Sequence, residues 1–207
     1  MGKIEKKNAI ADVAFELFLS NGYSTTKIID IAKAAGIGKG TVYEYFASKE
    51  SLLLYLIENR VAKEYGELMD SVATAGGAEE MLRKYLQVEA HFIGKYGRYI
   101  DEMRTQFIEA GTEDAEKIMS AVLEIIQTQF RTVMGIVETG VEEGVFRSVA
   151  PRMTATCISG FVATYLTSVF DKKGVQGMAE GVAPIGSEPE GFTEDELLNI
   201  ILHGIGA

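Results

Sequence analysis

The sequence predicts an all-α protein, and three observations lead to this fold class. Apolar residues recur at intervals of three and four along most of the 207-residue chain, the period of a helix with one buried face. β-Branched residues form no alternating runs, and prolines, which break helices, number only three. With 47% apolar residues, the chain is able to bury a hydrophobic core. We expect a three-helix N-terminal domain over residues 1–50 and a C-terminal helical domain over residues 51–207.

Charge differs between the two parts of the chain. The total net charge is −10, yet residues 1–60 hold eight lysines and arginines against seven acidic residues. Four of these lysines fall between Ser24 and Lys49, where only Asp30 and Glu44 oppose them. The acidic total therefore does not exclude nucleic-acid binding, because the local field of the N-terminal part is able to be positive.

The first two helices of the N-terminal part follow from apolar spacing. From Ile10, apolar residues fall at i, i+3, i+4, i+7 and i+8, and Asn21-Gly22 ends this helix in the manner of a glycine C-cap. A second helix, with an apolar stripe from Ile28, starts after a Thr25 or Thr26 cap and ends at Gly36.

A third helix begins near Gly38 or Lys39 and completes a helix-turn-helix. Val42 and Phe46 lie one turn apart and are expected to face inward. At about 100° per residue, Glu44 then points outward, where it either accepts a hydrogen bond from a cytosine amino group or is solvated; solvation is favoured, because an acid near phosphates is unfavourable. Lys39 lies at the helix start, where free N–H groups attract phosphate. Two short helices joined by a tight turn that contains glycine are typical of a DNA-binding helix-turn-helix.

The glycines of this turn also allow a nucleotide-binding loop to be considered. Gly36, Gly38 and Gly40 do not form GxGxxG, because Thr41 follows directly, and no GxxxxGK[ST] is present. A simple turn is therefore the expected structure.

Several of these segments together resemble the N-terminal signature of the TetR/AcrR family of bacterial transcriptional regulators. The resemblance covers about residues 8–55 and rests on Gly22-Tyr23-Ser24-Thr25-Thr26, Asp30-Ile31-Ala32, the run from Ala35 to Phe46, and Lys49-Glu50-Ser51-Leu52. It implies an all-helical homodimer whose N-terminal helix-turn-helix reads the major groove of an operator and whose C-terminal domain binds a small ligand. By position it implies nine DNA contacts: Thr25, Thr26, Lys27, Lys39, Gly40, Thr41, Tyr43, Tyr45 and Lys49.

The C-terminal part is predicted to be a set of longer helices. Apolar periodicity indicates helices near residues 48–72, 78–95, 98–109, 112–143, 151–170 and 193–203, with a glycine-rich loop over 171–191. The helix over 151–170 is apolar on nearly every side, so a partner subunit is its expected cover. Together with 193–203 it would form a four-helix dimer interface, in agreement with the resemblance. A membrane span over 153–170 is the less favoured alternative.

An effector pocket is the least constrained part of the prediction. Methionine and aromatic side chains of the C-terminal helices are able to line an adaptable apolar cavity for a small, apolar effector, although a core position is the favoured explanation for any single one of them. The candidates are His91, Phe92, Tyr99, Met103, Phe107, Met119, Phe130, Met134, Phe161 and Tyr165.

Other classes of protein find less support in the sequence. The two histidines, His91 and His203, lie far apart, and no metal-ligand or catalytic spacing stands near them, so we expect no cofactor, no metal and no enzyme. The single cysteine, Cys157, is expected to be a buried, inert thiol, and its isolation indicates a reducing, cytoplasmic location. A helical carrier of small hydrophobic molecules with a vestigial DNA-binding head remains the alternative function.

Overall fold

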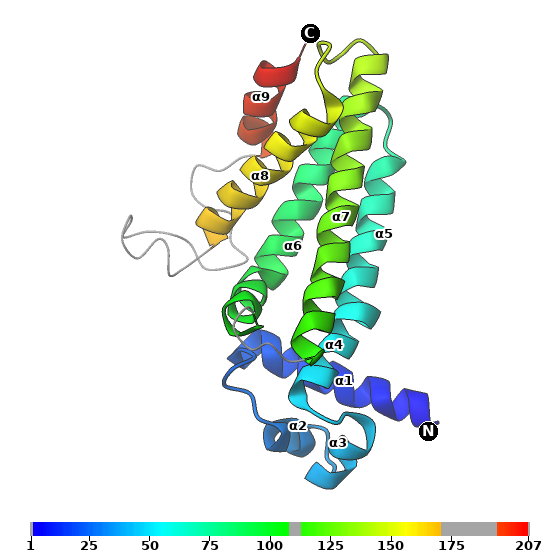
Figure 1. Cartoon of the computed structure of the whole chain (residues 1–207), viewed down its shortest axis with the longest axis vertical. Helices are drawn as coiled ribbons and strands as arrows, with labels where there is room; N and C mark the ends of the chain where they lie inside the picture. The colour runs from blue at the N-terminus through cyan, green and yellow to red at the C-terminus, as the bar shows by residue number, and fades with distance from the viewer. Residues whose placement is uncertain (1, 108–112, 171–193, 207) are drawn as a thin grey trace. The chain divides into compact units, whose positions relative to one another are not determined.

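The computed structural model describes residues 2–107, 113–170 and 194–206, with side chains for 2–96, 113–166 and 195–206. Every regular element in these ranges is a helix, which confirms the all-α prediction (Figure 1). The chain divides into two compact units, Met1–Glu64 with Tyr99–Glu124 and Tyr65–Arg98 with Ile125–Ala207. The functional boundary expected near residue 50 stays a prediction, because this division reports compactness and not function.

The first unit begins with the predicted short helices, α1 (Lys3–Asn21), α2 (Ile28–Ala34) and α3 (Lys39–Tyr45). Gly22 ends α1 with φ of +91°, a conformation that glycine adopts without a steric penalty. The buried face of α1 is rotated relative to its apolar spacing, since Ala11 and Phe15 are buried while Val13 and Leu17 are only half-buried. The core of this unit contains Ile10, Ala14, Phe18, Tyr23, Ile31, Val42, Phe46, Leu52 and Leu53.

The predicted cap of α2 is wrong. Its N-cap residue is Lys27, whose backbone N–H donates to the Asp30 carboxylate at 3.0 Å. The hydroxyls of Thr25 and Thr26 instead turn back and donate to carbonyls at the end of α1. A threonine hydroxyl bonds to carbonyls of the preceding turn as readily as it caps a following helix, and here the first option prevails.

A long helical run follows Ser48, as expected. It consists of α4 (Lys49–Leu56), the π-helical turn η1 (Ile57–Val61) and α5 (Ala62–Ala73). The Ser48 hydroxyl accepts from the Ser51 N–H at 2.9 Å, so Ser48 is the N-cap. Ile57 and Val61 are both buried within the π-helical turn.

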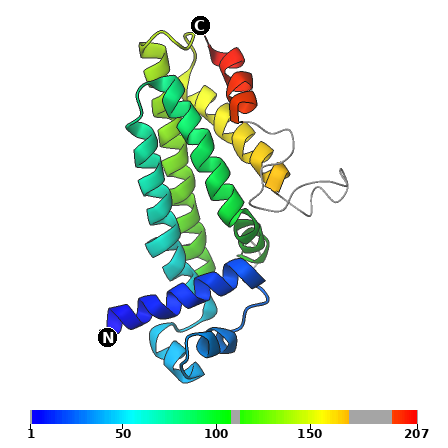
Figure 2. The ribbon, with the colours of Figure 1, turned by 180° about the vertical axis from the view of Figure 1, so that it is seen from behind.

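The remaining helices are α6 (Ala78–Phe107), α7 (Glu113–Glu142), α8 (Pro151–Phe170) and α9 (Glu194–Ile205). Figures 1 and 2 show α5, α6 and α7 side by side and α9 next to α8. The break predicted at Gly97 is absent, since α6 continues through it; a single glycine weakens a helix by only about 1 kcal/mol, which packing offsets. The predicted caps at Gly111-Thr112 and Thr193 and the loop over 171–191 lie outside the described residues.

A close contact in the second unit gives a test of this packing. The Phe146 ring lies against Gly140 of α7, and a Cβ added to Gly140 would stand 2.0 Å from that ring. We expect Gly140→Ala to lower the free energy of unfolding by about 2 kcal/mol through overpacking. Gly135→Ala, five residues earlier in the same helix with open space around it, should leave stability unchanged or raise it by up to about 1 kcal/mol. Urea denaturation of both variants measures the difference, and equal stabilities would contradict the contact.

Candidate nucleic-acid interface and a buried polar cluster

The turn between α2 and α3 is built on one glycine. Gly36 has φ of +65°, in the left-handed region that favours glycine. The N–H of Ile37 then donates back to the Ala32 carbonyl at 2.9 Å, which satisfies an acceptor at the end of α2. This closed turn fixes the direction in which α3 leaves α2.

The two faces of α3 divide as the sequence predicts. Val42 is 0% exposed and Phe46, just after the helix, is 3% exposed, so both belong to the core. On the opposite side, four residues are exposed, and the Lys39 ammonium lies 5.7 Å from the centre of the Tyr43 ring. This outward face consists of Lys39, Gly40, Tyr43 and Glu44, with Thr41 and Tyr45 half-buried at its edges.

In the segment before α2, two of the three predicted DNA-contact residues are exposed and one is buried. Thr25 and Lys27 are exposed. Thr26 is 2% exposed, and its hydroxyl donates to the Gly22 carbonyl at 2.8 Å. A DNA contact by the Thr26 side chain was therefore a wrong expectation, because that side chain completes the end of α1.

Lys49 was also expected at the DNA backbone, and the structure gives its ammonium another role. The Nζ atom donates to the carbonyls of Tyr23 at 2.8 Å and of Thr26 at 3.0 Å, and it lies 4.1 Å from the centre of the Tyr23 ring. Lys49 thus ties the start of α4 to the connection between α1 and α2. The expected phosphate contact by Lys49 is corrected to a structural one.

Residues 10–56, which contain this helix-turn-helix, match the domain described as bacterial regulatory proteins, tetR family. The chain is 28% identical over 142 residues to the fatty acid metabolism regulator protein of Bacillus subtilis, covering 69% of this chain and 71% of that protein. It is 29% identical over 152 residues to the transcriptional repressor KstR2 of Rhodococcus jostii, covering 71% of each. The chain belongs to the TetR family.

A solved structure shares the fold of this chain over its described length. A protein from Saccharomonospora viridis, described as a transcriptional regulator and crystallised in complex with choline, matches with a TM-score of 0.78 at 20% identity. The match covers 99% of this chain and 100% of that one, and at this identity it shows the fold alone. The protein is a DNA-binding transcriptional regulator of the TetR family, and the carrier alternative is not supported. No helix among the described residues has the length and hydropathy of a membrane span.

The predicted effector pocket is not assembled as expected. Phe92 is buried, but His91 is exposed and Phe161 is 41% exposed, so neither lines an interior cavity of this chain. Met119, Phe130, Met134 and Tyr165 are half-buried, and Met119 belongs to the first unit rather than the second. The side chains of Tyr99, Met103 and Phe107 lie outside the described residues. Cys157 is exposed, which contradicts the expected buried thiol.

A buried polar cluster in the second unit escaped the sequence prediction. Glu89 on α6 is 3% exposed, and with Thr26 it forms the set of fully buried polar or charged residues among those described. Its carboxylate accepts from the Tyr65 hydroxyl of α5 at 2.5 Å and from the Gln129 amide of α7 at 2.8 Å. The Gln129 amide also donates to the Tyr85 hydroxyl at 3.3 Å. One signal was present in the sequence: Tyr85, Glu89 and Phe92 share one helical face, which places an acid within an apolar stripe.

Burial dominates the electrostatics of this cluster. It raises the pKa of Glu89 to about 7, while hydrogen bonds from Tyr65 and Gln129 act in the opposite direction. Burial also raises the pKa of Tyr65 and of Tyr85 well above their ordinary range, and the negative charge of Glu89 adds to both shifts. The cluster therefore contains a carboxylic acid that changes its charge near neutral pH, next to two phenols that stay neutral there.

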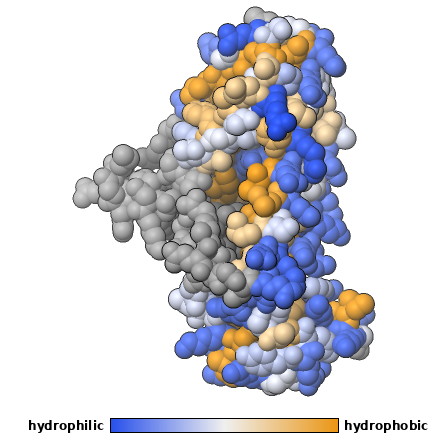
Figure 3. Space-filling view, in the orientation of Figure 1, coloured by the Kyte–Doolittle hydropathy of each residue, from blue (hydrophilic) through white to orange (hydrophobic). Residues whose placement is uncertain are grey.

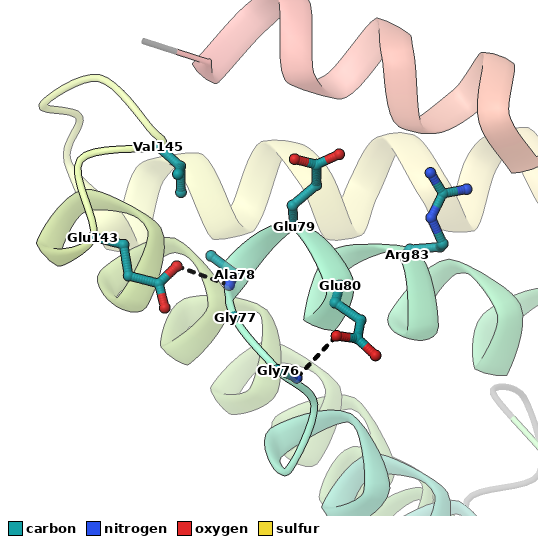
Figure 4. Close-up of a pocket in the computed structure, with 8 residues that line it drawn as sticks. All are labelled: Gly76, Gly77, Ala78, Glu79, Glu80, Arg83, Glu143 and Val145. Carbon is teal, nitrogen blue, oxygen red and sulfur yellow. Dashed lines mark hydrogen bonds between the residues drawn. The ribbon is translucent and has the colours of Figure 1, made fainter.

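A surface depression in the same unit is explained by helix capping. It has a volume of about 370 Å³ and lies at the start of α6 (Figure 4). The Glu143 carboxylate accepts from the Ala78 N–H at 3.0 Å, and the Glu80 carboxylate accepts from the Gly76 N–H at 3.2 Å. These acids satisfy backbone donors that the helix start leaves unpaired, and we assign no ligand to this depression.

The shifted pKa of Glu89 makes a prediction about stability and pH. A glutamate whose pKa rises from 4.5 in the unfolded chain to about 7 in the fold binds more protons in the fold between these values. The contribution of Glu89 to the free energy of unfolding is therefore at its maximum below pH 4.5 and is lost as pH rises through 7. We expect wild type to lose about 3 kcal/mol relative to Glu89→Gln between pH 4.5 and 8. Urea denaturation of both proteins over this range measures it, and a pH-independent difference would contradict the buried environment.

Proposed function

We propose that this regulator is a ligand-responsive repressor that binds a near-palindromic operator as a homodimer. The observation that carries the proposal is the outward face of α3, where Lys39 and Tyr43 stand exposed on a helix whose opposite side is fixed in the core. A helix of this kind fits the major groove, with lysines on phosphates and neighbouring side chains on bases. The proposed contacts are Thr25, Lys27, Lys39, Gly40, Thr41, Tyr43 and Tyr45.

Titration of DNA binding with salt tests this interface. The operator is first selected from a random DNA pool, and binding is then measured at several salt concentrations. Lys39→Ala should weaken binding about tenfold at low salt and reduce the salt slope by about one, because one phosphate contact is lost. Tyr43→Ala should weaken binding with little change in slope, since tyrosine carries no charge.

Lys33→Ala provides the matched control, because Lys33 is an exposed lysine of α2 outside the proposed contact set. It should bind the operator as wild type does. Wild-type affinity for the selected DNA no higher than for random DNA, or an unchanged salt slope in Lys39→Ala, would contradict the proposed interface.

The dimer is proposed to form through α8 and α9. Met153 and Phe161 on α8 and Ile200 on α9 are 68%, 41% and 60% exposed, which is unusual for side chains of this size. Met153, Cys157, Gly160 and Thr164 repeat at intervals of three and four, and all are exposed, so they form one stripe of α8. Figure 3 shows apolar surface gathered over this part of the second unit. A second copy of the chain is the proposed cover for this surface.

A charge placed in this surface tests the dimer. Phe161→Glu should convert the dimer to a monomer and weaken operator binding at least tenfold, because two carboxylates would be buried at a symmetric interface. Val145→Glu, at an exposed valine outside α8 and α9, is the control and should remain dimeric. Analytical ultracentrifugation measures both. A short bismaleimide should also link wild-type chains through Cys157, the single cysteine. A monomeric wild type, or a dimeric Phe161→Glu, would overturn the proposed interface.

We further propose that the effector binds in the second unit and opposes operator binding. Tyr65, which donates to Glu89, lies on α5 in the helical run that starts at Lys49 beside the helix-turn-helix. A ligand that shifts α5 would therefore act along the same run of helix on the position of the DNA-binding helices. Operator spacing of about 34–36 Å between half-sites makes binding sensitive to such a shift. Ligand and operator would then oppose each other through one coupling free energy.

A further inference from the structure

The Glu89 cluster brings side chains of four helices together inside the second unit. Tyr65 comes from α5, Glu89 and Tyr85 from α6, and Gln129 from α7. Ser159 of α8 lies beside Tyr85, where its hydroxyl lowers the pKa of that phenol against the larger effect of burial. A polar centre reached from four helices is a position where one small molecule is able to contact all of them.

The hydrogen-bonding capacity of this centre is only partly used. A carboxylate offers about four acceptor positions, and the bonds from Tyr65 and Gln129 occupy two of those on Glu89. The Ser159 Oγ atom is buried beside the Tyr85 hydroxyl. Buried polar atoms are normally satisfied, so the two unused acceptor positions of this buried carboxylate leave room for a further partner.

The negative charge of ionised Glu89 is not neutralised within the cluster. The other polar groups of the cluster are neutral: two phenols, one amide and one hydroxyl. Among the described side chains, none of the observed ion pairs includes Glu89. Taking an unpaired carboxylate out of water costs several kcal/mol, which a bound cation would offset.

Aromatic rings adjoin the carboxylate. The Tyr65 ring, whose hydroxyl bonds to Glu89, lies 4.6 Å from the Phe92 ring, and the Phe92 ring lies 4.7 Å from the Tyr96 ring. The ring planes are inclined by 60° and 52°, so their faces point in different directions. Aromatic faces attract organic cations, and quaternary ammonium groups in particular are recognised by sets of such rings.

We propose that Glu89 anchors an organic ammonium ligand, bound between α5, α6, α7 and α8 with the Tyr65, Phe92 and Tyr96 rings beside it. This inference rests on the proposed function in naming that ligand as the effector. It replaces the apolar effector of the sequence prediction with a cation, because an acidic side chain is buried among the apolar residues of the unit.

Calorimetric titration of the full-length dimer tests the anchor. The probes are benzyltrimethylammonium, benzylamine, tetraethylammonium and, as the neutral comparison, benzyl alcohol. At least one cation should bind more than tenfold tighter than benzyl alcohol, and Glu89→Gln should weaken that cation about 10- to 100-fold. Glu80→Gln removes an exposed acid of the same helix and should leave the affinity unchanged. Binding of no cation at millimolar concentration, or equal binding to Glu89→Gln, would overturn the proposal.

Wild type alone provides a second readout that needs no folded variant. Protons and the cation compete for Glu89, whose pKa is about 7, so affinity should fall about tenfold per pH unit below that value. The other groups that face the carboxylate, Tyr65, Tyr85, Gln129 and Ser159, do not titrate between pH 5 and 8. An affinity that is flat over this range would contradict a carboxylate anchor.

Operator binding measured on the same samples separates this inference from the proposed function. Wild type and Glu89→Gln should bind the selected operator equally, and the bound cation should release wild type alone. Operator binding without cation binding would overturn the proposed ammonium site and would still support the proposed repressor function. Cation binding that depends on Glu89 but leaves operator affinity unchanged confirms the site and defeats its role as effector.

Discussion

The recognition helix α3 keeps its outward face only because its other face is held in the core. Seven residues are too few for a stable isolated helix, so burial of Val42 and Phe46 supplies what helix propensity does not. The Gly36 turn fixes one end of α3. After its other end, Lys49 at the start of α4 binds the carbonyls of Tyr23 and Thr26. Thr26 and Lys49, which the family resemblance implies as DNA contacts, thus form hydrogen bonds that hold the domain together.

The second unit contains an acidic side chain, Glu89, inside an apolar interior. Hydrogen bonds from Tyr65 and Gln129 reduce the desolvation penalty of Glu89 without removing it, since the pKa stays raised. A leucine at this position would avoid the penalty, so the acid has a use that packing alone does not explain. The proposed ligand cation would give it one, and the proposed route of that ligand to the DNA-binding helices is the continuous helical run from Lys49 to Ala73.

The exposed apolar surface of α8 and α9 adds a third constraint. We expected the helix over 151–170 to be poorly covered by one small domain, and within this chain α8 is buried on one side only. One side of α8 is buried within the chain and consists of Ala155, Ile158, Val162 and Leu166. On the other side, Met153, Cys157 and Phe161 are exposed. The exposure of Cys157 and Phe161 contradicts their assignment to a buried thiol and to a pocket, and it supports a surface that a second copy covers.

Residue spacing was enough to predict the helical class, the helix-turn-helix and the division of α3 into inner and outer faces. These features are local: apolar spacing, one glycine with positive φ and a serine cap each act within a few residues. Contacts between distant segments explain why Thr26 and Lys49 bond within the fold, why Gly97 lies inside a continuous helix, and why Glu89 is buried with Tyr65, Tyr85 and Gln129. Each of these depends on what packs against a residue from a distant part of the chain, and a repeating pattern within one helix carries no information about its neighbours.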